Sequence, residues 1–154
     1  GTNLGDPVET GALMQVYGAE RVDPLFISSV KANIGHLEAG AGIAGLMSAI
    51  MALYHHTAPP NAELTELNNK VAATVRDVPF MFPKACVDIP KGTKPSLIAG
   101  VSSFGYSGTI AHALLEEPPA SNRRALNDFA TYLPLQDSPR YVTTLIYLLN
   151  VIIY

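Results

Sequence analysis

The stretch "VKANIGHLEAGAGIAGLMSAI", residues 30–50, contains the pattern that decides the fold. The preceding "LFISSVK", residues 25–31, is rich in β-branched and apolar residues and predicts a strand. Residues 37–55 predict a helix that carries no charge from Ala39 to Tyr54, and Pro59 and Pro60 end this unit. Because a bilayer span needs about 20 apolar residues, we expect this helix to be buried between layers of a folded domain.

The flanking segments extend this strand-then-helix order. Residues 5–18 predict a helix with Asp6 as N-cap, Glu9 as its capping-box partner and Gly18 at the C-terminal end. Its expected apolar face consists of Val8, Ala12, Leu13 and Val16. "SLIAGVSS" (residues 96–103) and "IAHALLEE" (residues 110–117) predict two strands that pair as a hairpin around "FGYSGT". Residues 61–94 show little periodicity and are expected to be irregular. The order of elements predicts an α/β fold.

Composition limits the classes of function. The 154 residues suffice for one domain with a core, and 48% are hydrophobic against 15% charged. The net charge of −3, without a basic block, argues against nucleic acid as a partner. The single Cys86 fits a reducing compartment, and we find no secretory signal, so we expect a cytoplasmic protein.

The C-terminal end differs in character from the rest. Residues 120–140 predict a linker, and the apolar residues 141–154 are too few for a bilayer span, so we expect no membrane location. We expect either a strand or an aggregation-prone tail, and a membrane anchor is the alternative. No role is assigned to residues 120–154.

His36 is the leading candidate for chemistry, although a lone histidine is more often structural. It follows Gly35, which permits a tight turn, and it stands at the start of a helix, where the dipole favours the neutral imidazole. A neutral imidazole can donate a hydrogen bond to a carbonyl oxygen and stabilise an enolate. Lys31, at the expected end of the strand, could orient the site by its charge or could simply be solvated.

Weaker candidates lie elsewhere in the chain. The turn at residues 104–108 could bind an oxyanion through backbone N–H groups freed by its glycines, or it could be a plain hairpin turn. Glu38 could serve the helix dipole or a site. His55 and His56 lack a third ligand nearby in sequence, so we expect no metal site, and nothing near Cys86 would activate its thiol.

Four motifs in order resemble the C-terminal part of a β-ketoacyl synthase, the condensing enzyme of fatty-acid and polyketide synthases. They are "GTNLGDPVE", "SSVKANIGHLEAGAGIAGLMSAI", "PPN" at residues 59–61 and "AGVSSFGYSGTIAHALLEEP". The resemblance covers residues 1–119 and is strongest to the polyketide branch. It implies the C-terminal half of a thiolase-like layered α/β fold, followed by an unassigned tail at residues 120–154.

The resemblance also implies an activity: the decarboxylative Claisen condensation of an acyl thioester with a malonyl-type thioester. The substrate would be carried on the phosphopantetheine of an acyl carrier protein, with no cofactor bound directly and with a homodimer as the assembly. His36 matches the second catalytic histidine, and Lys31 matches the active-site lysine. The matching oxyanion loop consists of Phe104, Gly105, Tyr106, Ser107 and Gly108. The backbone N–H of Tyr106 would enter the oxyanion hole, and its ring would be the gating aromatic.

The sequence also departs from the family pattern. Gly1 and Thr2 match the last two letters of the family's HGTGT motif, so the first histidine and the nucleophilic cysteine are not in this chain. Ser107 and Ile110 replace a glycine and an asparagine of the family's loop. We therefore expect a fragment with half of an active site, inactive by itself. A non-catalytic relative, acting as a dimerisation or chain-length partner, is the alternative function.

Overall fold

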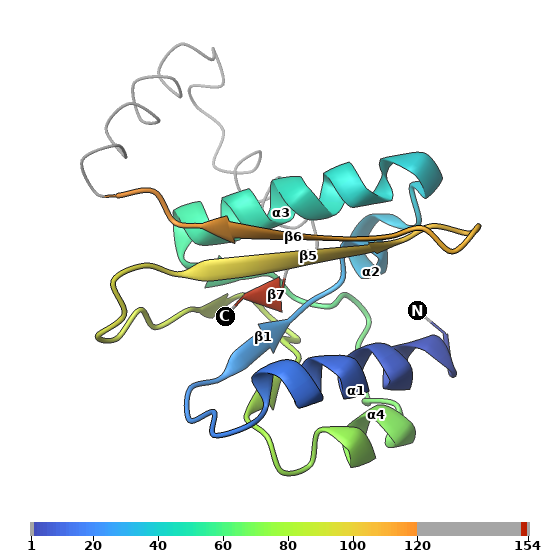
Figure 1. Ribbon diagram of the computed structural model, residues 1–154, viewed down its shortest axis with the longest axis horizontal. Coiled ribbons are helices and arrows are strands. Elements are labelled where there is room, and N and C mark those ends of the chain that lie inside the picture. Colours follow the sequence, from blue (N-terminus) through green and yellow to red (C-terminus); the bar gives the residue numbers. More distant parts are fainter. Residues whose placement is uncertain (1, 120–151, 154) are drawn as a thin grey trace.

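The computed structural model describes residues 2–119 together with the backbone of Ile152 and Ile153 (Figure 1). The predicted linker and the remainder of the apolar end lie outside the described residues. In chain order the elements are α1 (Gly5–Tyr17), β1 (Leu25–Ile27), α2 (Val30–Ile34), the 3₁₀ turn η1 (Glu38–Gly40), α3 (Ala41–His55), β2 (Thr57–Ala58), α4 (Asn69–Thr74), β3 (Phe80–Met81), β4 (Val87–Asp88), β5 (Ile98–Phe104), β6 (Ile110–Glu116) and β7 (Ile152–Ile153).

The elements form three layers around a five-stranded sheet with the order β3-β1-β7-β5-β6 (Figure 1). Helix α3 covers one face of the sheet, and α1, with α4 beside it, covers the other face near β1 and β3. Strands β1 and β3 are parallel, whereas β5 and β6 form an antiparallel hairpin. A separate two-stranded ladder joins β2 to β4. The prediction of an α/β fold is confirmed.

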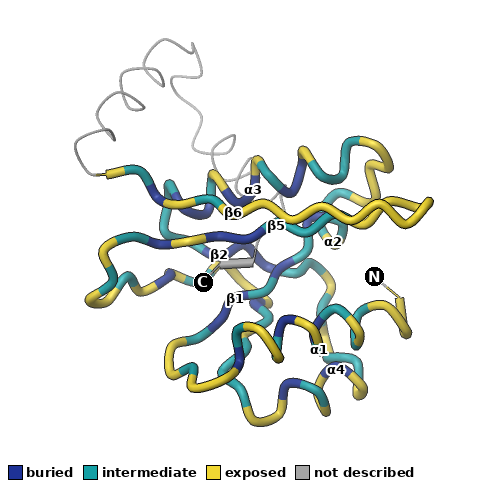
Figure 2. The backbone as a smooth tube through the Cα atoms, viewed as in Figure 1, coloured by how far each residue is buried: buried dark blue, intermediate teal, exposed yellow. Residues whose placement is uncertain are grey.

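Successive residues of β1 supply the core on both sides of the sheet, as the alternation of a strand requires. Phe26 packs with Leu53 of α3 and with Ala99 of β5, while Leu25 packs with Leu13 of α1. Leu25 and Ala99 are fully buried. Figure 2 shows this buried centre in dark blue between the two helical layers.

The predicted strand at residues 25–31 is too long. Strand β1 ends at Ile27, and Lys31 lies in the short helix α2 instead of at a strand end. Gly35 ends α2 with φ 80° and ψ 178°, a combination that only glycine adopts without strain. The turn at Gly35 leads the chain to His36 and into the next helix.

The predicted helix at residues 37–55 is confirmed as η1 followed by α3. Only one face of α3 is buried, through Ala44, Gly45, Ser48, Ala49, Ala52 and Leu53. On the opposite face, Ile43, Met47 and Ile50 are about half exposed or more. In the described part of the chain, the prediction that this helix is buried between layers is therefore wrong for that face of α3. Within the described residues, no helix combines the length and the hydropathy that crossing a bilayer requires.

The expected cap of α1 is wrong by two residues. The hydroxyl of Thr2 accepts the Gly5 N–H at 2.8 Å, and the Asp6 carboxylate accepts the Thr2 N–H at 3.1 Å. Gly18 ends the helix, as predicted. The expected apolar face is also wrong: Val8, Ala12 and Val16 are exposed, because α1 packs through Thr10 and Leu13.

Residues 61–94 are not wholly irregular, as they contain α4, β3 and β4. The Asn68 side chain caps α4 by accepting the Lys70 N–H at 2.9 Å. These elements are six residues long or shorter. Elements of this length carry no measurable hydrophobic period, which explains why the sequence pattern missed them.

The predicted hairpin is confirmed, with Ile98 opposite Glu116 and Phe104 opposite Ile110. Its second strand and the connecting turn are largely exposed, and Figure 2 shows them in yellow. The hairpin therefore contributes to the core mainly through β5.

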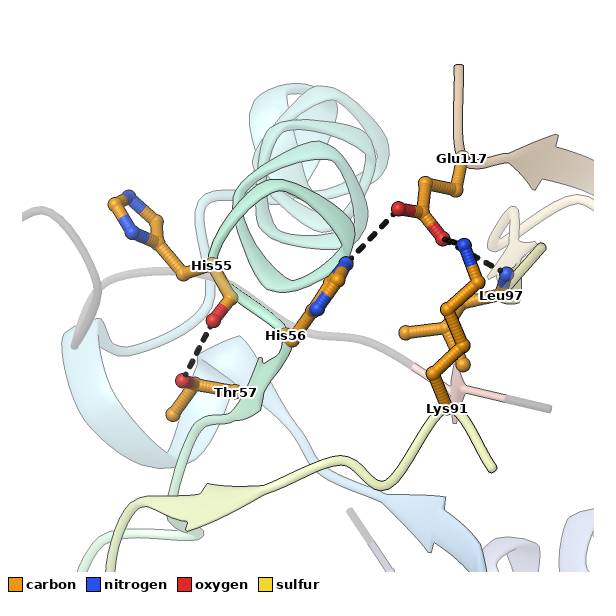
Figure 3. Close-up of polar contacts among 6 residues, drawn as sticks. All are labelled: His55, His56, Thr57, Lys91, Leu97 and Glu117. Carbon is orange, nitrogen blue, oxygen red and sulfur yellow. Dashed lines mark hydrogen bonds and ion pairs between the residues drawn. The ribbon is translucent and has the colours of Figure 1, made fainter. Parts of the chain in front are cut away.

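A buried carboxylate anchors the end of this hairpin to the end of α3 (Figure 3). Glu117, with its side chain 3% exposed, accepts from His56 Nε2 at 3.0 Å and from Lys91 Nζ at 3.1 Å. It also accepts the Leu97 N–H at 3.2 Å. His56 ends α3 in the left-handed conformation, with φ 52°. Three segments that are distant in sequence thus meet at one charged group, which holds α3 against the sheet.

Candidate functional site

A cavity of about 700 Å³ opens where β1 and β5 end, between α1 and the segment from α2 to η1. His36, Lys31 and Phe104 all line it, together with Glu9 of α1. The structure therefore brings three of the sequence-predicted site residues to one place. His36 is exposed at the cavity, and Lys31 is half-buried.

The imidazole of His36 has a defined orientation. Its Nδ1 accepts the backbone N–H of Glu38 at 2.8 Å. A backbone N–H can only donate, so Nδ1 must be the unprotonated nitrogen and Nε2 must carry the proton. Glu38 reaches this position with φ 49°, a left-handed conformation that is uncommon for a residue with a side chain. The local backbone thus selects one tautomer, and that tautomer leaves Nε2–H to donate elsewhere.

Glu9 faces the cavity as well, although the sequence pattern assigned it to a capping box. Burial raises the pKa of the Glu9 carboxyl above its ordinary value of 4.5, and the positive charge of Lys31 opposes this shift. The sequence signal that could have indicated a place at the cavity is the spacing of Glu9 from Asp6. Residues one helical turn apart lie on the same face of the helix, and both of these residues line the cavity.

Two asparagines fix the segment that carries Lys31 and His36. Asn61 accepts the Ser29 N–H at 2.7 Å and donates to the Ile27 carbonyl at 3.1 Å. Asn33, between Lys31 and His36, donates to the Pro60 carbonyl at 2.9 Å and accepts the Ala62 N–H at 3.2 Å. Each asparagine therefore binds the backbone of the other one's segment. The sequence analysis gave no role to Asn33 or Asn61.

The predicted oxyanion loop is not assembled around the cavity. Of residues 104–108, Phe104 alone is among the cavity's lining residues. The Gly105 N–H donates to the Thr109 carbonyl and the Gly108 N–H to the Gly105 carbonyl, so both are used within the turn. Tyr106 is fully exposed, and Ser107 is exposed beside it. In the described part of the chain, this segment has the geometry of a hairpin turn.

Of the weaker candidates, Glu38 lines the cavity, whereas Cys86, His55 and His56 do not. Cys86 is a free, exposed cysteine, and burial lowers the pKa of the His55 imidazole. Among the described residues, no three histidine, cysteine, aspartate or glutamate side chains are close enough to hold a metal ion.

Comparison with known proteins agrees with this arrangement of motifs. The family described as "Beta-ketoacyl synthase, C-terminal domain" matches residues 1–65. The 6-methylsalicylic acid synthase of Aspergillus niger is 43% identical over 150 residues, covering 94% of this chain and 8% of that protein. Erythronolide synthase EryA3 of Saccharopolyspora erythraea is 45% identical over 124 residues, covering 79% of this chain and 4% of that protein.

Among solved structures, the oxazolomycin ketosynthase domain OzmH KS7 of Streptomyces albus is similar, with a TM-score of 0.65 and 27% identity. The match covers 95% of this chain and 29% of that domain's chain. This chain thus spans less than a tenth of the length of those two synthases and under a third of the ketosynthase structure. The chain belongs to the β-ketoacyl synthase family and has the α/β fold of the C-terminal half of a thiolase-like ketosynthase domain.

Proposed function

We propose that the cavity bearing His36 serves the decarboxylative Claisen condensation of polyketide biosynthesis. The observation that carries this proposal is the hydrogen bond from the Glu38 N–H to His36 Nδ1, which leaves a protonated Nε2 at the cavity. A neutral donor fixed in this way can stabilise negative charge as it develops on a thioester oxygen.

The chemistry consists of two linked steps. In the first, the bond between the malonyl α-carbon and its carboxylate breaks, CO₂ leaves, and the electron pair moves onto the thioester oxygen as an enolate. His36 Nε2–H donates to that oxygen. In the second, the enolate carbon attacks an acyl thioester, a carbon–carbon bond forms, and the acyl group's thiolate leaves.

Lys31 supports the first step through its charge. It lines the same cavity and lies close enough to Glu9 to oppose the rise in the Glu9 pKa. A fixed ammonium favours both the incoming malonyl carboxylate and the enolate that replaces it. The negative charge of Glu9 limits the net positive charge of the cavity. Lys31 and Glu9 together therefore set the electrostatic potential at the reacting group.

The acyl-carrying thiol comes from outside this chain in our proposal. Cys86, the one cysteine of the sequence, is exposed and does not line the cavity. In the described part of the chain, the Tyr106 N–H has no backbone acceptor, so it is available to an oxyanion. For the turn at residues 104–108 to act as an oxyanion hole, further protein would have to cover the hairpin.

The partners follow from the substrate class. The matched relatives are named as synthases of 6-methylsalicylic acid and erythronolide, which supports acyl chains delivered on the phosphopantetheine of an acyl carrier protein. A homodimer and a cytoplasmic location belong to the same proposal, the location because a lone cysteine outside any disulfide fits a reducing compartment.

The test is a chimaera in which residues 1–119 replace the matching segment of the Aspergillus niger synthase. Decarboxylation of a malonyl thioester by the chimaera, lost by a factor of about 100 or more in His36→Ala, would support the proposal. Equal decarboxylation in both would contradict it. His36→Gln, which retains an N–H donor, is the matched control and should keep more activity than His36→Ala.

A second assay addresses the isolated chain. We expect no acyl loading when it is incubated with an acyl thioester, and a mass shift at Cys86 would overturn that expectation.

The alternative, a non-catalytic partner, is favoured by Ser107 and Ile110, which depart from the family's loop. A folded, dimeric chimaera without decarboxylation would support this alternative.

A further inference from the structure

Strands β5 and β6 carry a serine–histidine pair that the proposed condensation does not use. Ser102 and His112 are directly opposite each other in the hairpin, and the Ser102 hydroxyl lies 2.9 Å from Nδ1 of His112. Directly opposite residues of antiparallel strands project from the same face of the sheet. Ala99 and Val101 pack in the cluster that contains Leu53 of α3, so the alternation of a strand places Ser102 on the face away from α3.

Ser102 also lines the 700 Å³ cavity that contains His36. It is half-buried, whereas His112 is exposed and is not among the lining residues. On the same face of β5, the cavity is lined by Gly100, which has no side chain, and by Phe104, which is apolar. Within β5, Ser102 is therefore the residue of this face that offers the cavity a side-chain hydrogen bond, and His112 orients its hydroxyl.

The position of the His112 proton decides what the Ser102 hydroxyl can offer to a ligand. With Nδ1 unprotonated, the hydroxyl donates to Nδ1, and its oxygen can accept from a ligand. With Nδ1 protonated, Nδ1–H donates to that oxygen, and the hydroxyl can donate to a ligand. A ligand hydroxyl fits both arrangements, because it can donate in the first and accept in the second. A ketone fits only the second arrangement, and a methylene group fits neither.

We propose that Ser102, oriented by His112, binds a hydroxyl group on C3 of the acyl chain, so that the cavity selects 3-hydroxyacyl thioesters over saturated ones. This inference rests on the proposed function, in which the acyl carbonyl carbon lies beside the enolate at His36 that attacks it. C3 is two bonds further along the acyl chain, and Ser102 and His36 line one cavity. Ser102 is then a specificity-determining residue, and His112 is a positioning residue that acts through it.

The test measures binding to the full chain by NMR titration, and its two probes are the pantetheine thioesters of 3-hydroxybutyrate and of butyrate. The wild-type chain should bind the 3-hydroxybutyryl thioester about fivefold more tightly, which corresponds to one hydrogen bond between neutral groups. Ser102→Ala should bind both probes equally, and Ser102→Thr, which retains the hydroxyl, should keep the preference. Equal dissociation constants in the wild type, no binding of either probe, or a preference that survives in Ser102→Ala would overturn the inference.

Two controls separate recognition of the ligand from a general effect on the strand. Ser103→Ala should leave the preference unchanged, because Ser103 is on the α3 face of β5, where its Oγ would lie 3.3 Å from a Cβ on Gly42. His112→Ala should reduce the preference, and His112→Asn, whose amide can take the place of Nδ1, should restore it. A purely structural role of the pair would change both dissociation constants by the same factor, and this result would contradict the inference.

Failure of this inference is distinguishable from failure of the proposed function. Equal dissociation constants for the two thioesters, together with decarboxylation that depends on His36 in the chimaera, would overturn this inference alone. Equal decarboxylation by the chimaera and its His36→Ala variant would overturn the proposed function, whereas a fivefold preference that is lost in Ser102→Ala would still support the contact between Ser102 and the C3 hydroxyl.

Discussion

The side chain of Asn61 accepts the backbone N–H of Ser29 at 2.7 Å, across 32 residues of sequence. Ser29 is the residue before α2, the helix that contains Lys31 and leads to His36. Because the same amide also donates to the carbonyls of Ile27 and Pro83, one side chain fixes the end of β1, the start of α2 and the loop before Lys84. The segment that carries Lys31 and His36 is thus held by an amide rather than by apolar packing alone.

Replacing Asn61 by alanine should lower the free energy of unfolding by about 2–3 kcal/mol, since the Ser29 N–H and the Ile27 carbonyl lose the side chain they bind, while the Pro83 carbonyl keeps the backbone N–H of residue 61. Denaturant unfolding measures this change. Asn68→Ala is the matched control, because Asn68 makes an exposed helix cap worth about 1 kcal/mol. Equal losses for the two variants would contradict the special position of Asn61.

Lys31→Met should raise the pKa of Glu9 further above 4.5, because Lys31 lowers that pKa against the larger effect of burial. A ¹³C NMR titration of the Glu9 carboxyl in both proteins measures the two midpoints. Lys70→Met, an exposed lysine on α4, is the control. A midpoint that falls or stays the same in Lys31→Met would refute the coupling.

Glu9 should also make stability depend on pH. With its pKa raised in the folded state, the folded protein binds the proton more tightly, so this contribution is fully present below 4.5 and is lost as pH rises through the folded-state pKa. Glu9→Gln should remove this decline. The difference in unfolding free energy between wild type and Glu9→Gln, measured from pH 4 to pH 8, gives the effect. A difference that is constant over that range would show that Glu9 has an ordinary pKa.

Glu117→Ala should be among the most destabilising single changes, at about 3 kcal/mol or more, because Lys91 and His56 would lose a buried counter-charge. Thermal unfolding measures it. The adjacent Glu116→Ala, at an exposed position, should cost less than about 1 kcal/mol. Similar melting temperatures for the two variants would be inconsistent with the network in Figure 3.

The exposed face of α3 should govern self-association. Ile43→Glu and Met47→Lys should change stability by no more than about 0.5 kcal/mol and should reduce aggregation, because both side chains are already in contact with solvent. Sedimentation velocity measures the association. Ala49→Glu, on the buried face of the same helix, should unfold the chain. Unchanged association in the two surface variants would exclude this face as its cause.

The sequence predicted α3 and the β5–β6 hairpin because both are long and strongly patterned. The sequence placed Lys31 on a strand because the β-branched Val30 follows Ile27 after two serines, and nothing local reveals that α2 begins at Val30. Glu9 was misassigned because its spacing from Asp6 satisfies a capping box, whereas the charge that acts on its pKa is that of Lys31 in α2, 22 positions later. The hydrogen bond between His36 and Glu38 depends on a left-handed φ at Glu38, which no propensity indicates.

The central claim is that His36 presents a protonated Nε2 to the cavity, and its tautomer is measured most directly by ¹⁵N NMR of the imidazole at pH 8.5. We predict that Nε2 carries the proton and that Nδ1 shows the shift of an unprotonated nitrogen that accepts a hydrogen bond from Glu38. A spectrum in which Nδ1 carries the proton would contradict the account, because Nε2 would then have no proton to donate to a thioester oxygen.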